Sequence, residues 1–270
     1  MFNIKEPVVS GEHKEYLRKI KIRKLSILLT QIALLVLFFI LWEVTARYKI
    51  IDPFITSQPS RIIRTLSNLY QEGHLFKHIG VTCGETVVGF LLGTLLGTII
   101  AVILWWSDFL SKVMEPYLVV LNSLPKIALG PVFIVWIGAG PAAIIVIAMS
   151  ISIVVTILEV LNGFLGVDKD KVKLVKTFGA SKLQVLLKVI LPSSMPVIVN
   201  ALKVNVGLSW VGVIVGEFLV SRAGIGYLIV YGGQVFQLDL VMASVLILSL
   251  AAALMYQVVA YVERLIVKIK

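Results

Sequence analysis

The sequence predicts an all-α integral membrane protein with six transmembrane helices and both termini in the cytoplasm. Of its 270 residues, 59% are hydrophobic and 15% are charged, and the mean hydropathy is +0.98. Soluble domains are about 45–50% apolar and about 25% charged, so the composition argues against a soluble fold. Six apolar runs alternate with polar segments, and a run of about 20 residues suffices for one crossing. We expect the spans at residues 25–42, 86–107, 116–137, 142–161, 195–219 and 240–262.

The first apolar run has a cleaved signal peptide as its rival interpretation, because residues 44–46 (Val-Thr-Ala) resemble a cleavage site. The run is longer than the ~7–15 residues of a signal core, so we expect an uncleaved span. The third run contains Lys126 and two prolines, Pro125 and Pro131. A Gly-Ala-Gly-Pro turn at residues 138–141 joins it to the fourth run as an antiparallel hairpin.

Lysine and arginine residues gather on one side of the six predicted spans. Seventeen lie in segments that share a side with the termini, and six lie in the opposite segments. The positive-inside rule therefore places both termini and the segment 167–192 in the cytoplasm. The net charge of +10 could suggest a nucleic-acid partner. Basic residues interleaved with aromatics are absent, so we expect no nucleic acid.

The predicted spans divide the chain into four segments. They are a basic cytoplasmic tail at 1–24, a first span with an external amphipathic segment at 25–80, a five-span core at 81–265, and a tail at 266–270. Within the second segment, Ser60 is expected to cap a helix that ends at Gly73. That helix would lie on the membrane surface or pack against the bundle.

Three glycines in the second span, Gly89, Gly93 and Gly97, recur every four residues and share one helix face. Small residues at this spacing allow two helices to approach closely in lipid. The pattern predicts tight packing without identifying the partner helix.

The segment from Val167 to Pro192 is the longest polar interruption in the second half of the chain, and it carries six lysines. Apolar residues recur at helical spacing within it, which predicts two short amphipathic helices. They are Val172, Leu174 and Val175 in the first helix, and Leu183, Leu186, Leu187 and Ile190 in the second. Gly179 would allow a sharp turn between them, and Pro192 would bend the chain before the next span. Such a helix pair is typical of a docking surface for another protein.

The residue patterns of common enzyme sites are missing from the sequence. It contains no Gly-Lys dipeptide, hence no phosphate-binding loop, and no HExxH zinc motif. His74, His78 and Cys83 could form a metal site, but ordinary surface residues are the favoured interpretation. Gly224-Ile225-Gly226 is too short for a nucleotide fingerprint and is interpreted as a loop turn. We therefore expect a non-catalytic chain that binds no cofactor or metal.

Polar and charged residues inside the predicted spans are candidates to line a solute pathway, which would suit an anionic solute. The candidates are Asn122, Lys126, Lys203, Asn205, Ser209, Trp210 and Glu217. Lys126 and Lys203 are expected in the cytoplasmic halves of their spans. The alternatives are lysines that reach the inner interface, pairing of Lys126 with Glu159, and helix–helix hydrogen bonds for the uncharged residues.

Several segments resemble permease subunits of bacterial ABC importers, specifically the nitrate, sulfonate and taurine branch. In that family the cytoplasmic loop begins Glu-Ala-Ala, has a central glycine and ends Ile-x-Leu-Pro. Here Lys173-Leu174-Val175 replaces Glu-Ala-Ala, whereas Gly179, Ala180 and the Val189-x-Leu191-Pro192 ending fit. Further matches are Leu124-Pro125 to Pro131, Trp136 to Gly140, Leu208-Ser209-Trp210, Gly216-Glu217 and Gly224 to Leu228.

The resemblance implies a type I ABC importer permease fold and a mechanism. Two permease chains, expected to be identical, would form the pathway, and an external binding protein would deliver the solute. Two cytoplasmic ATPase subunits would hold ATP and Mg and receive the 167–192 loop. The residues expected to couple to the ATPase are Lys173, Val175, Phe178, Gly179, Ala180, Ser181, Leu183 and Pro192. Phe178 and Leu183 are expected to anchor the contact, with the lysines at its rim.

Four alternatives remain open. The branch includes relatives that move riboflavin or thiamine-precursor pyrimidines. A secondary transporter driven by an ion gradient would usually show internal repeats and charges near mid-span, and neither is evident. An intramembrane enzyme would present paired His, Asp or Ser groups within spans; a scaffold in a membrane complex is the least specific possibility.

Overall fold

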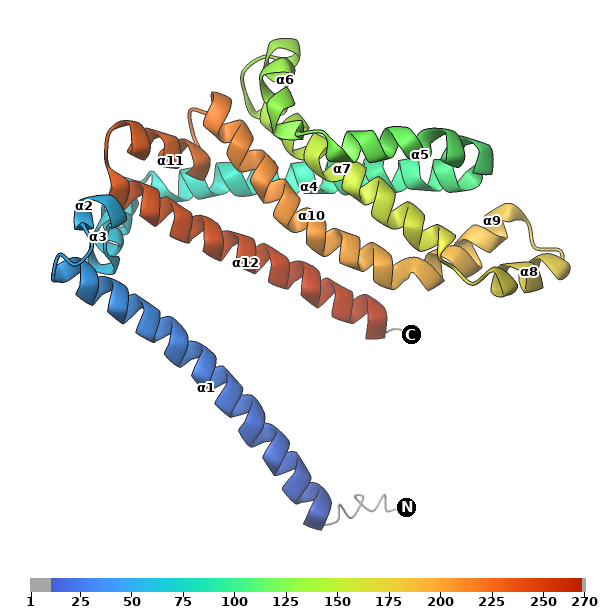
Figure 1. Cartoon of the computed structure of the whole chain (residues 1–270), viewed down its shortest axis with the longest axis horizontal. Coiled ribbons are helices and arrows are strands. Elements are labelled where there is room, and N and C mark those ends of the chain that lie inside the picture. Colours follow the sequence, from blue (N-terminus) through green and yellow to red (C-terminus); the bar gives the residue numbers. More distant parts are fainter. Residues whose placement is uncertain (1–10, 269–270) are drawn as a thin grey trace, which may run out of the picture. The chain divides into compact units, whose positions relative to one another are not determined.

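The computed structural model describes residues 11–268, and helices are the regular elements of this part of the chain (Figure 1). The basic and C-terminal tails predicted at 1–24 and 266–270 therefore lie partly outside the described residues. The chain divides into two units, the first ending at Ile63 and the second beginning at Arg64. The predicted boundary between residues 80 and 81 instead falls within a helix of the second unit.

The first unit contains α1 (Gly11–Arg47), α2 (Pro53–Thr56) and the start of α3 (Pro59–Gln71). The long helix α1 includes the predicted first span. Asp52 caps α2 by accepting a hydrogen bond from the Phe54 amide at 2.9 Å. The prediction that Ser60 caps α3 is wrong, because that helix begins one residue earlier. Ser60 instead donates from its hydroxyl to Glu43 Oε1 at 2.9 Å and from its amide to Glu43 Oε2 at 3.0 Å.

Five helices within residues 11–268 are long and apolar enough to cross a membrane. Besides α1 they are α4 (Leu75–Trp106), α7 (Pro141–Leu165), the helix from Lys182 to Val220 that includes α10 (Leu191–Val220), and α12 (Leu238–Lys268). A sixth crossing is broken into α5 (Asp108–Ser123) and the segment Lys126–Ile137, which meet at 85°. That segment comprises the 3-10 turn η1 (Lys126–Leu129) and α6 (Gly130–Ile137).

The broken crossing corrects two predictions. The third span is not one helix from Pro116 to Ile137, because Pro125 interrupts it. It also begins earlier, at Asp108, where the Ser107 hydroxyl caps α5 by accepting from the Leu110 amide at 3.2 Å. At about 1.5 Å per residue, the 16 residues of α5 span about 24 Å. Lys126 follows them, at the bend between α5 and the segment Lys126–Ile137.

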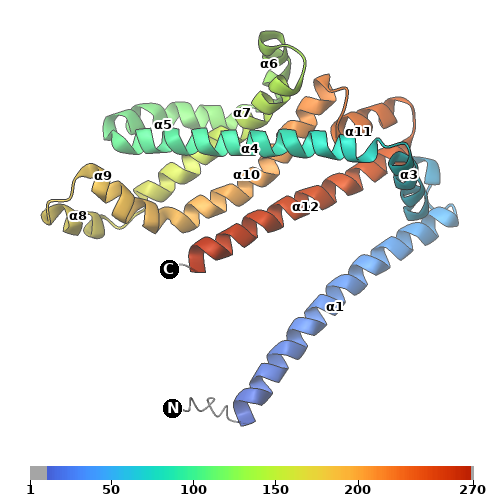
Figure 2. The same cartoon turned by 180° about the vertical axis from the view of Figure 1, so that it is seen from behind.

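Helices α4, α7 and α10 pack against one another in the second unit, and α7 crosses α4 in both views (Figures 1 and 2). The predicted glycine face of α4 is the face that α7 covers. A Cβ atom at Gly89 would lie 3.0 Å from Ala148, one at Gly97 would lie 2.6 Å from Thr156, and one at Gly93 would collide with Ser152. Small residues on α7 recur at the same four-residue spacing, which allows the two helices to approach closely.

Helix α10 also packs closely on α7, and Ala148 takes part in both contacts. A Cβ atom at Gly212 of α10 would collide with Ala148, and one at Gly216 would lie 3.0 Å from Ile144. Toward the cytoplasmic end, the core of this unit gathers around Phe164, Val160 and Ile190, all at most 2% exposed. The loop formed by α8 (Lys169–Thr177) and α9 (Lys182–Val185) lies at the opposite end of the unit from α11 (Ile225–Gln234) in both views (Figures 1 and 2).

Candidate functional site

The predicted docking segment folds as two short helices joined by a tight turn. The first helix, α8 (Lys169–Thr177), is capped by Asp168, whose carboxylate accepts a hydrogen bond from the Asp170 amide at 2.9 Å. Phe178 is the C-cap of the helix, and Gly179 follows with φ +79°. The Ala180 amide then donates to the Val175 carbonyl at 3.1 Å. A glycine with positive φ closing the last turn in this way is a common helix terminator.

The second helix, α9 (Lys182–Val185), starts with a reciprocal cap. The Gln184 amide donates to the Ser181 hydroxyl at 3.3 Å, and the Ser181 amide donates to Gln184 Oε1 at 2.8 Å. The Ser-x-x-Gln spacing is the sequence signature of this cap, although Gln184 was not among the predicted coupling residues. The turn and the cap fix the path of the loop between α8 and α9.

A π turn, η2 (Leu186–Ile190), joins α9 to α10, so the helix continues through the position of Pro192. The Leu191 amide donates to the Leu186 carbonyl, five residues back. A proline has no amide hydrogen and its ring clashes with the carbonyl four residues earlier in an α-helix. The wider π turn immediately before Pro192 gives the chain a way to accommodate that ring without ending the helix.

The predicted coupling residues lie on two different surfaces of the loop. Val185, Leu186 and Ile190 are buried in the cytoplasmic core, and Val172, Val175 and Ala180 pack against it. Four apolar side chains that recur at i, i+4 spacing are instead exposed to solvent. They are Leu174 and Phe178 on α8, and Leu183 and Leu187 on α9 and η2, here called the apolar docking face. Phe178 is 82% exposed.

Lys182 is not a free lysine of the rim, as predicted, but is bound to the end of α4. Its Nζ donates to the Trp106 carbonyl at 2.6 Å and lies 5.9 Å and 5.7 Å from the ring centroids of Trp105 and Trp106. Trp105 also makes an edge-to-face contact with Phe164 of α7, with centroids 6.4 Å apart. The ammonium therefore satisfies a carbonyl at a helix C-terminus, where positive charge is favourable, and it links α9 to α4.

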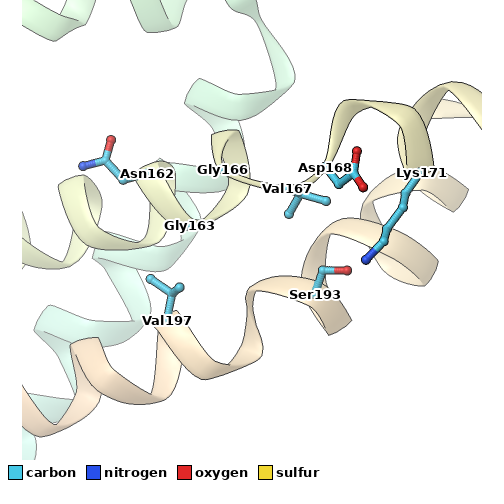
Figure 3. A pocket seen from close by; sticks show the side chains of 8 residues that line it. All are labelled: Asn162, Gly163, Gly166, Val167, Asp168, Lys171, Ser193 and Val197. Atoms are coloured by element: carbon cyan, nitrogen blue, oxygen red, sulfur yellow. The ribbon is translucent and has the colours of Figure 1, made fainter.

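A pocket of about 520 Å³ opens beside the loop, between the end of α7, the start of α8 and the first turns of α10 (Figure 3). The side chains of Lys171 and Ser193 point toward each other across it, whereas Asn162 points away (Figure 3). Gly163 allows the close approach of α7 and α10 here, since a Cβ would lie 3.0 Å from Val197. The Ser194 hydroxyl donates to the Gly163 carbonyl at 2.9 Å and holds the two helices together.

Two of the pathway candidates, Asn205 and Ser209, are fully buried among the helices of this chain. Asn205 Nδ2 donates to Thr156 Oγ1 at 2.5 Å and to Thr94 Oγ1 at 3.3 Å. These bonds join α10 to α7 and α4, which is the helix–helix alternative considered for the uncharged residues. Asn122 is exposed near the end of α5, and its carbonyl accepts from Lys126 Nζ at 3.0 Å.

Lys203 and Trp210 of α10 line one hollow of about 570 Å³ between α10 and α12. The hollow is mostly apolar. Lys203 Nζ lies 2.5 Å from Glu263 Oε2, and both side chains are partly buried, so its charge is neutralised within the chain. Lys126 forms no ion pair with Glu159 or with another carboxylate in residues 11–268.

Glu217, the remaining pathway candidate, is 1% exposed and stands in a network at the outer end of the unit. Its carboxylate accepts from Thr82 Oγ1 at 2.6 Å and from the Gly226 amide at 2.5 Å. The buried carboxyl of Glu85, 6% exposed, belongs to the same group of residues. A Cβ atom on Gly226 or Gly224 would collide with this carboxylate. We call these residues, Thr82, Glu85, Glu217, Gly224 and Gly226, the Glu217 cluster.

The Gly224-Ile225-Gly226 turn is thus one wall of that cluster. The Ile225 amide donates to Thr82 Oγ1 at 2.7 Å, and the Gly224 amide donates to His78 Nδ1 at 2.9 Å. His78 also stacks on Tyr227 with ring centroids 6.0 Å apart. The histidine considered as a metal ligand is therefore engaged in holding α11 to α4. No His, Cys, Asp and Glu group suited to a metal occurs within residues 11–268.

Comparison with known proteins adds to this geometry. Residues 93–268 match the family described as the binding-protein-dependent transport system inner membrane component. A probable ABC transporter permease protein of Haemophilus influenzae is 32% identical over 85% of this chain and 93% of its own length. A putative aliphatic sulfonates transport permease protein of Bacillus subtilis is 28% identical over 84% of this chain and 83% of its own.

Two solved transporters share the fold. One chain of a bacterial ABC transporter that imports the acidic polysaccharide alginate superimposes with a TM-score of 0.64 at 12% identity, covering 92% of this chain and 98% of that one. One chain of the MetNI methionine ABC transporter, in an inward-facing conformation, gives a TM-score of 0.55 at 21% identity, covering 70% and 97%.

Proposed function

The chain belongs to the family of binding-protein-dependent transport system inner membrane components, and we propose that its solute is a small organic or inorganic anion of the sulfonate, taurine or nitrate type. It is a permease subunit of an ABC importer and a multi-pass protein of the inner membrane. In our proposal two identical copies form the pathway, two cytoplasmic ATP-binding subunits hold ATP and Mg, and an external binding protein delivers the solute.

The lack of an ion pair at Lys126 is the observation that favours an anionic solute. Lys126 lies at the 85° break of the third crossing, where its ammonium contacts a backbone carbonyl and no carboxylate of the described chain. Lys203, in contrast, is neutralised by Glu263. An ionisable residue within a membrane crossing is costly and commonly marks the path of a solute. An uncompensated positive charge at a break in a helix suits a negatively charged solute.

Similar proteins support the same class but do not narrow it to one compound. Besides the sulfonate relative, an Escherichia coli protein named for taurine transport is 22% identical over 83% of this chain. Proteins named for formylaminopyrimidine and riboflavin transport are 25% and 26% identical over similar lengths. These two name the second candidate class, an uncharged heterocyclic solute.

The direct test is uptake by proteoliposomes that contain the permease with its ATP-binding subunits and binding protein. We expect ATP-dependent uptake of a labelled alkanesulfonate, taurine or nitrate, which an ionophore leaves unchanged. Uptake that continues with the ATPase inactivated, or that follows an ion gradient, would contradict the assignment as an importer. Uptake of riboflavin or a pyrimidine without uptake of anions would contradict the proposed solute class.

Lys126→Gln tests the residue that carries the proposal. We expect anion uptake to fall about tenfold, because the partly buried Lys126 would no longer place a positive charge beside the solute, and a tenfold change corresponds to about 1.4 kcal/mol. Lys112→Gln is the control, since Lys112 is an exposed lysine that pairs with Asp108 at 2.8 Å on α5. Equal uptake by the Lys126 and Lys112 variants would remove the support that Lys126 gives to an anionic solute.

A further inference from the structure

Two aromatic side chains project from the corner at which α3 leads into the membrane span α4. Tyr70 in the last turn of α3 is 60% exposed, and Phe76 in the first turn of α4 is 69% exposed. Their rings contact each other edge to face, with centroids 5.9 Å apart. Both residues belong to the second unit, which begins at Arg64 within α3. The chain therefore exposes an aromatic pair at the outer end of a span instead of packing it into the core.

The turn between the two helices holds this pair in place. Gly73 has φ +74°, and a Cβ atom there would meet nothing within 4 Å, so the backbone conformation is what requires glycine. The Gly73 amide donates to the Tyr70 carbonyl at 3.0 Å, and the His74 amide donates to the Leu69 carbonyl at 3.1 Å. These bonds close the end of α3 and set the direction in which α4 begins.

Phe76 lies at the outer end of an exposed apolar stripe on α4. Val87 and Leu91 follow Phe76 at i+11 and i+15, about three and four turns later, and are 44% and 56% exposed. The glycine face of α4, which α7 covers, lies on another side of the helix. Exposed aliphatic side chains on a membrane span are stable where acyl chains surround them. Phe76 therefore continues the lipid-facing surface of α4 to its outer end.

The end of α3 that belongs to the second unit is polar on one side and apolar on the other. Leu66, Leu69 and Tyr70 share the apolar side at i, i+3 and i+4; the two leucines are partly buried, and Tyr70 is exposed. Arg64 and Asn68 lie one turn apart on the other side, and both are exposed. A helix with leucine and aromatic residues on one side and basic residues on the other is typical of a segment that lies in the membrane interface.

We propose that the corner formed by Tyr70 and Phe76 is a phospholipid-binding surface, seated where headgroups and acyl chains of the outer leaflet meet. The end of α3 then lies along the membrane surface, which was one of the two positions that the sequence left open. Tyrosine suits this depth, because its ring is apolar and its hydroxyl reaches the headgroups. Exposed Arg64 and Lys77 supply positive charge for lipid phosphates.

Continuity with the apolar stripe of α4 is what assigns this surface to lipid. The external binding protein of the proposed function would approach from the aqueous side, whereas Phe76 shares its face of α4 with residues that contact acyl chains. The surface lies outside the solute pathway, and its role is to fix the depth at which α4 enters the membrane. The inference holds for any solute.

Spin labels on the full-length permease in phospholipid nanodiscs test this proposal. Single cysteines are introduced after Cys83, the one native cysteine, is replaced by alanine. Tyr70→Cys and Phe76→Cys probe the corner, Leu91→Cys is the control among the acyl chains, and Asn68→Cys is the control on the polar side of α3. Power saturation measures how often each label collides with oxygen, which concentrates among acyl chains, and with a water-soluble nickel chelate. We expect the ratio of oxygen to nickel collisions to be at least about threefold higher at positions 70 and 76 than at position 68, and highest at position 91.

Two other results would overturn the proposal. Nickel collisions as frequent at positions 70 and 76 as at position 68 would place the corner in water, as expected of a docking surface for the external binding protein. Few collisions with either reagent would show that protein covers the corner, such as a second copy of the chain. Each single variant keeps the other aromatic ring, and its thermal unfolding shows whether the fold is intact, so either position alone can decide the result. Solute uptake is measured separately, so this proposal and the proposed function can fail independently.

Discussion

At the outer end of the second unit, Glu217 is 1% exposed and accepts hydrogen bonds from α4 and α11, whereas at the cytoplasmic end Phe178 is 82% exposed on the apolar docking face. The outer end contains buried polar groups whose partners come from the same chain. The cytoplasmic end exposes the four apolar side chains of the docking face. The contrast is what our proposed function predicts, with the Glu217 cluster at the outer end fixed by contacts within the chain and the cytoplasmic end available for another subunit.

The same contrast appears in the glycines of the two ends. Gly226 is required because the Glu217 carboxylate occupies the space of a Cβ atom, so its role is close packing. A Cβ atom on Gly179 would meet no other atom within 4 Å, and the φ of +79° is what requires glycine there. One glycine serves contact within the chain, and the other sets the direction in which the loop is presented.

The largest effect is expected from Glu217→Ala. The substitution leaves the Gly226 amide buried without an acceptor and the Thr82 hydroxyl with only the longer contact to the His78 carbonyl at 3.2 Å, which together cost about 2 kcal/mol. We expect a lower midpoint of thermal unfolding in detergent, with loss of uptake as a consequence of that instability. Glu217→Gln retains an acceptor and should be affected less. If Glu217→Ala unfolds as the wild type does and loses uptake alone, Glu217 acts in the pathway, and the contrast between the two ends is wrong.

Phe178→Ala should have the opposite pattern, with normal stability and impaired coupling. Removing the exposed ring loses contact area with the ATP-binding subunit and little else, and an anchoring aromatic at an interface is commonly worth at least about 1.4 kcal/mol, or about tenfold in Kd. We expect ATPase binding to weaken by about this factor. Val135→Ala on α6 is the matched control, because Val135 is also 82% exposed. Equal binding by the two variants would contradict the docking role of Phe178.

Sequence patterns predicted the features that depend on local spacing. The two helices of the loop, the turn at Gly179 and the close packing of Gly89, Gly93 and Gly97 all follow from residues a few positions apart. The sequence did not predict that α7 is the partner of those glycines. Its contact residues, Ala148, Ser152 and Thr156, resemble many other small residues in apolar helices. The break of the third crossing at Pro125 had a signal in the sequence, whereas its angle is set by packing.

Polar contacts between residues far apart in the chain could not be predicted from the sequence, for a different reason. Thr82 and Glu217 are 135 positions apart, and nothing in either neighbourhood indicates the other. Lys182 binds the Trp106 carbonyl, a backbone group that every residue possesses, so its partner has no side-chain signature. Glu217 and Lys182 were accordingly assigned to the pathway and to the solvated rim by their charge alone.

Lys182 joins the cytoplasmic loop to α4. The other end of α4 contains Thr82 and Glu85 of the Glu217 cluster, so this helix runs between the two ends of the unit. The tie is modest in energy, since a cation over aromatic rings at an exposed site contributes about 0.5–1 kcal/mol. Lys182→Met keeps the length of the side chain but loses both the carbonyl contact and the charge over Trp105 and Trp106. Lys182→Arg retains a donor and a cation that stacks on aromatic faces.

We expect Lys182→Met to bind the ATP-binding subunit normally and unfold within about 1 kcal/mol of the wild type, yet to transport about threefold less solute per ATP hydrolysed. A motion of the loop would then reach α7 and α10, to which it is directly joined, but would be transmitted less completely to α4. Measuring solute uptake and ATP hydrolysis on the same proteoliposomes gives this ratio, and Lys182→Arg should restore it. If the methionine and arginine variants couple equally well, the link between α9 and α4 serves stability alone, and the packing of α4 on α7 through Gly89, Gly93 and Gly97 is sufficient to move the helices together.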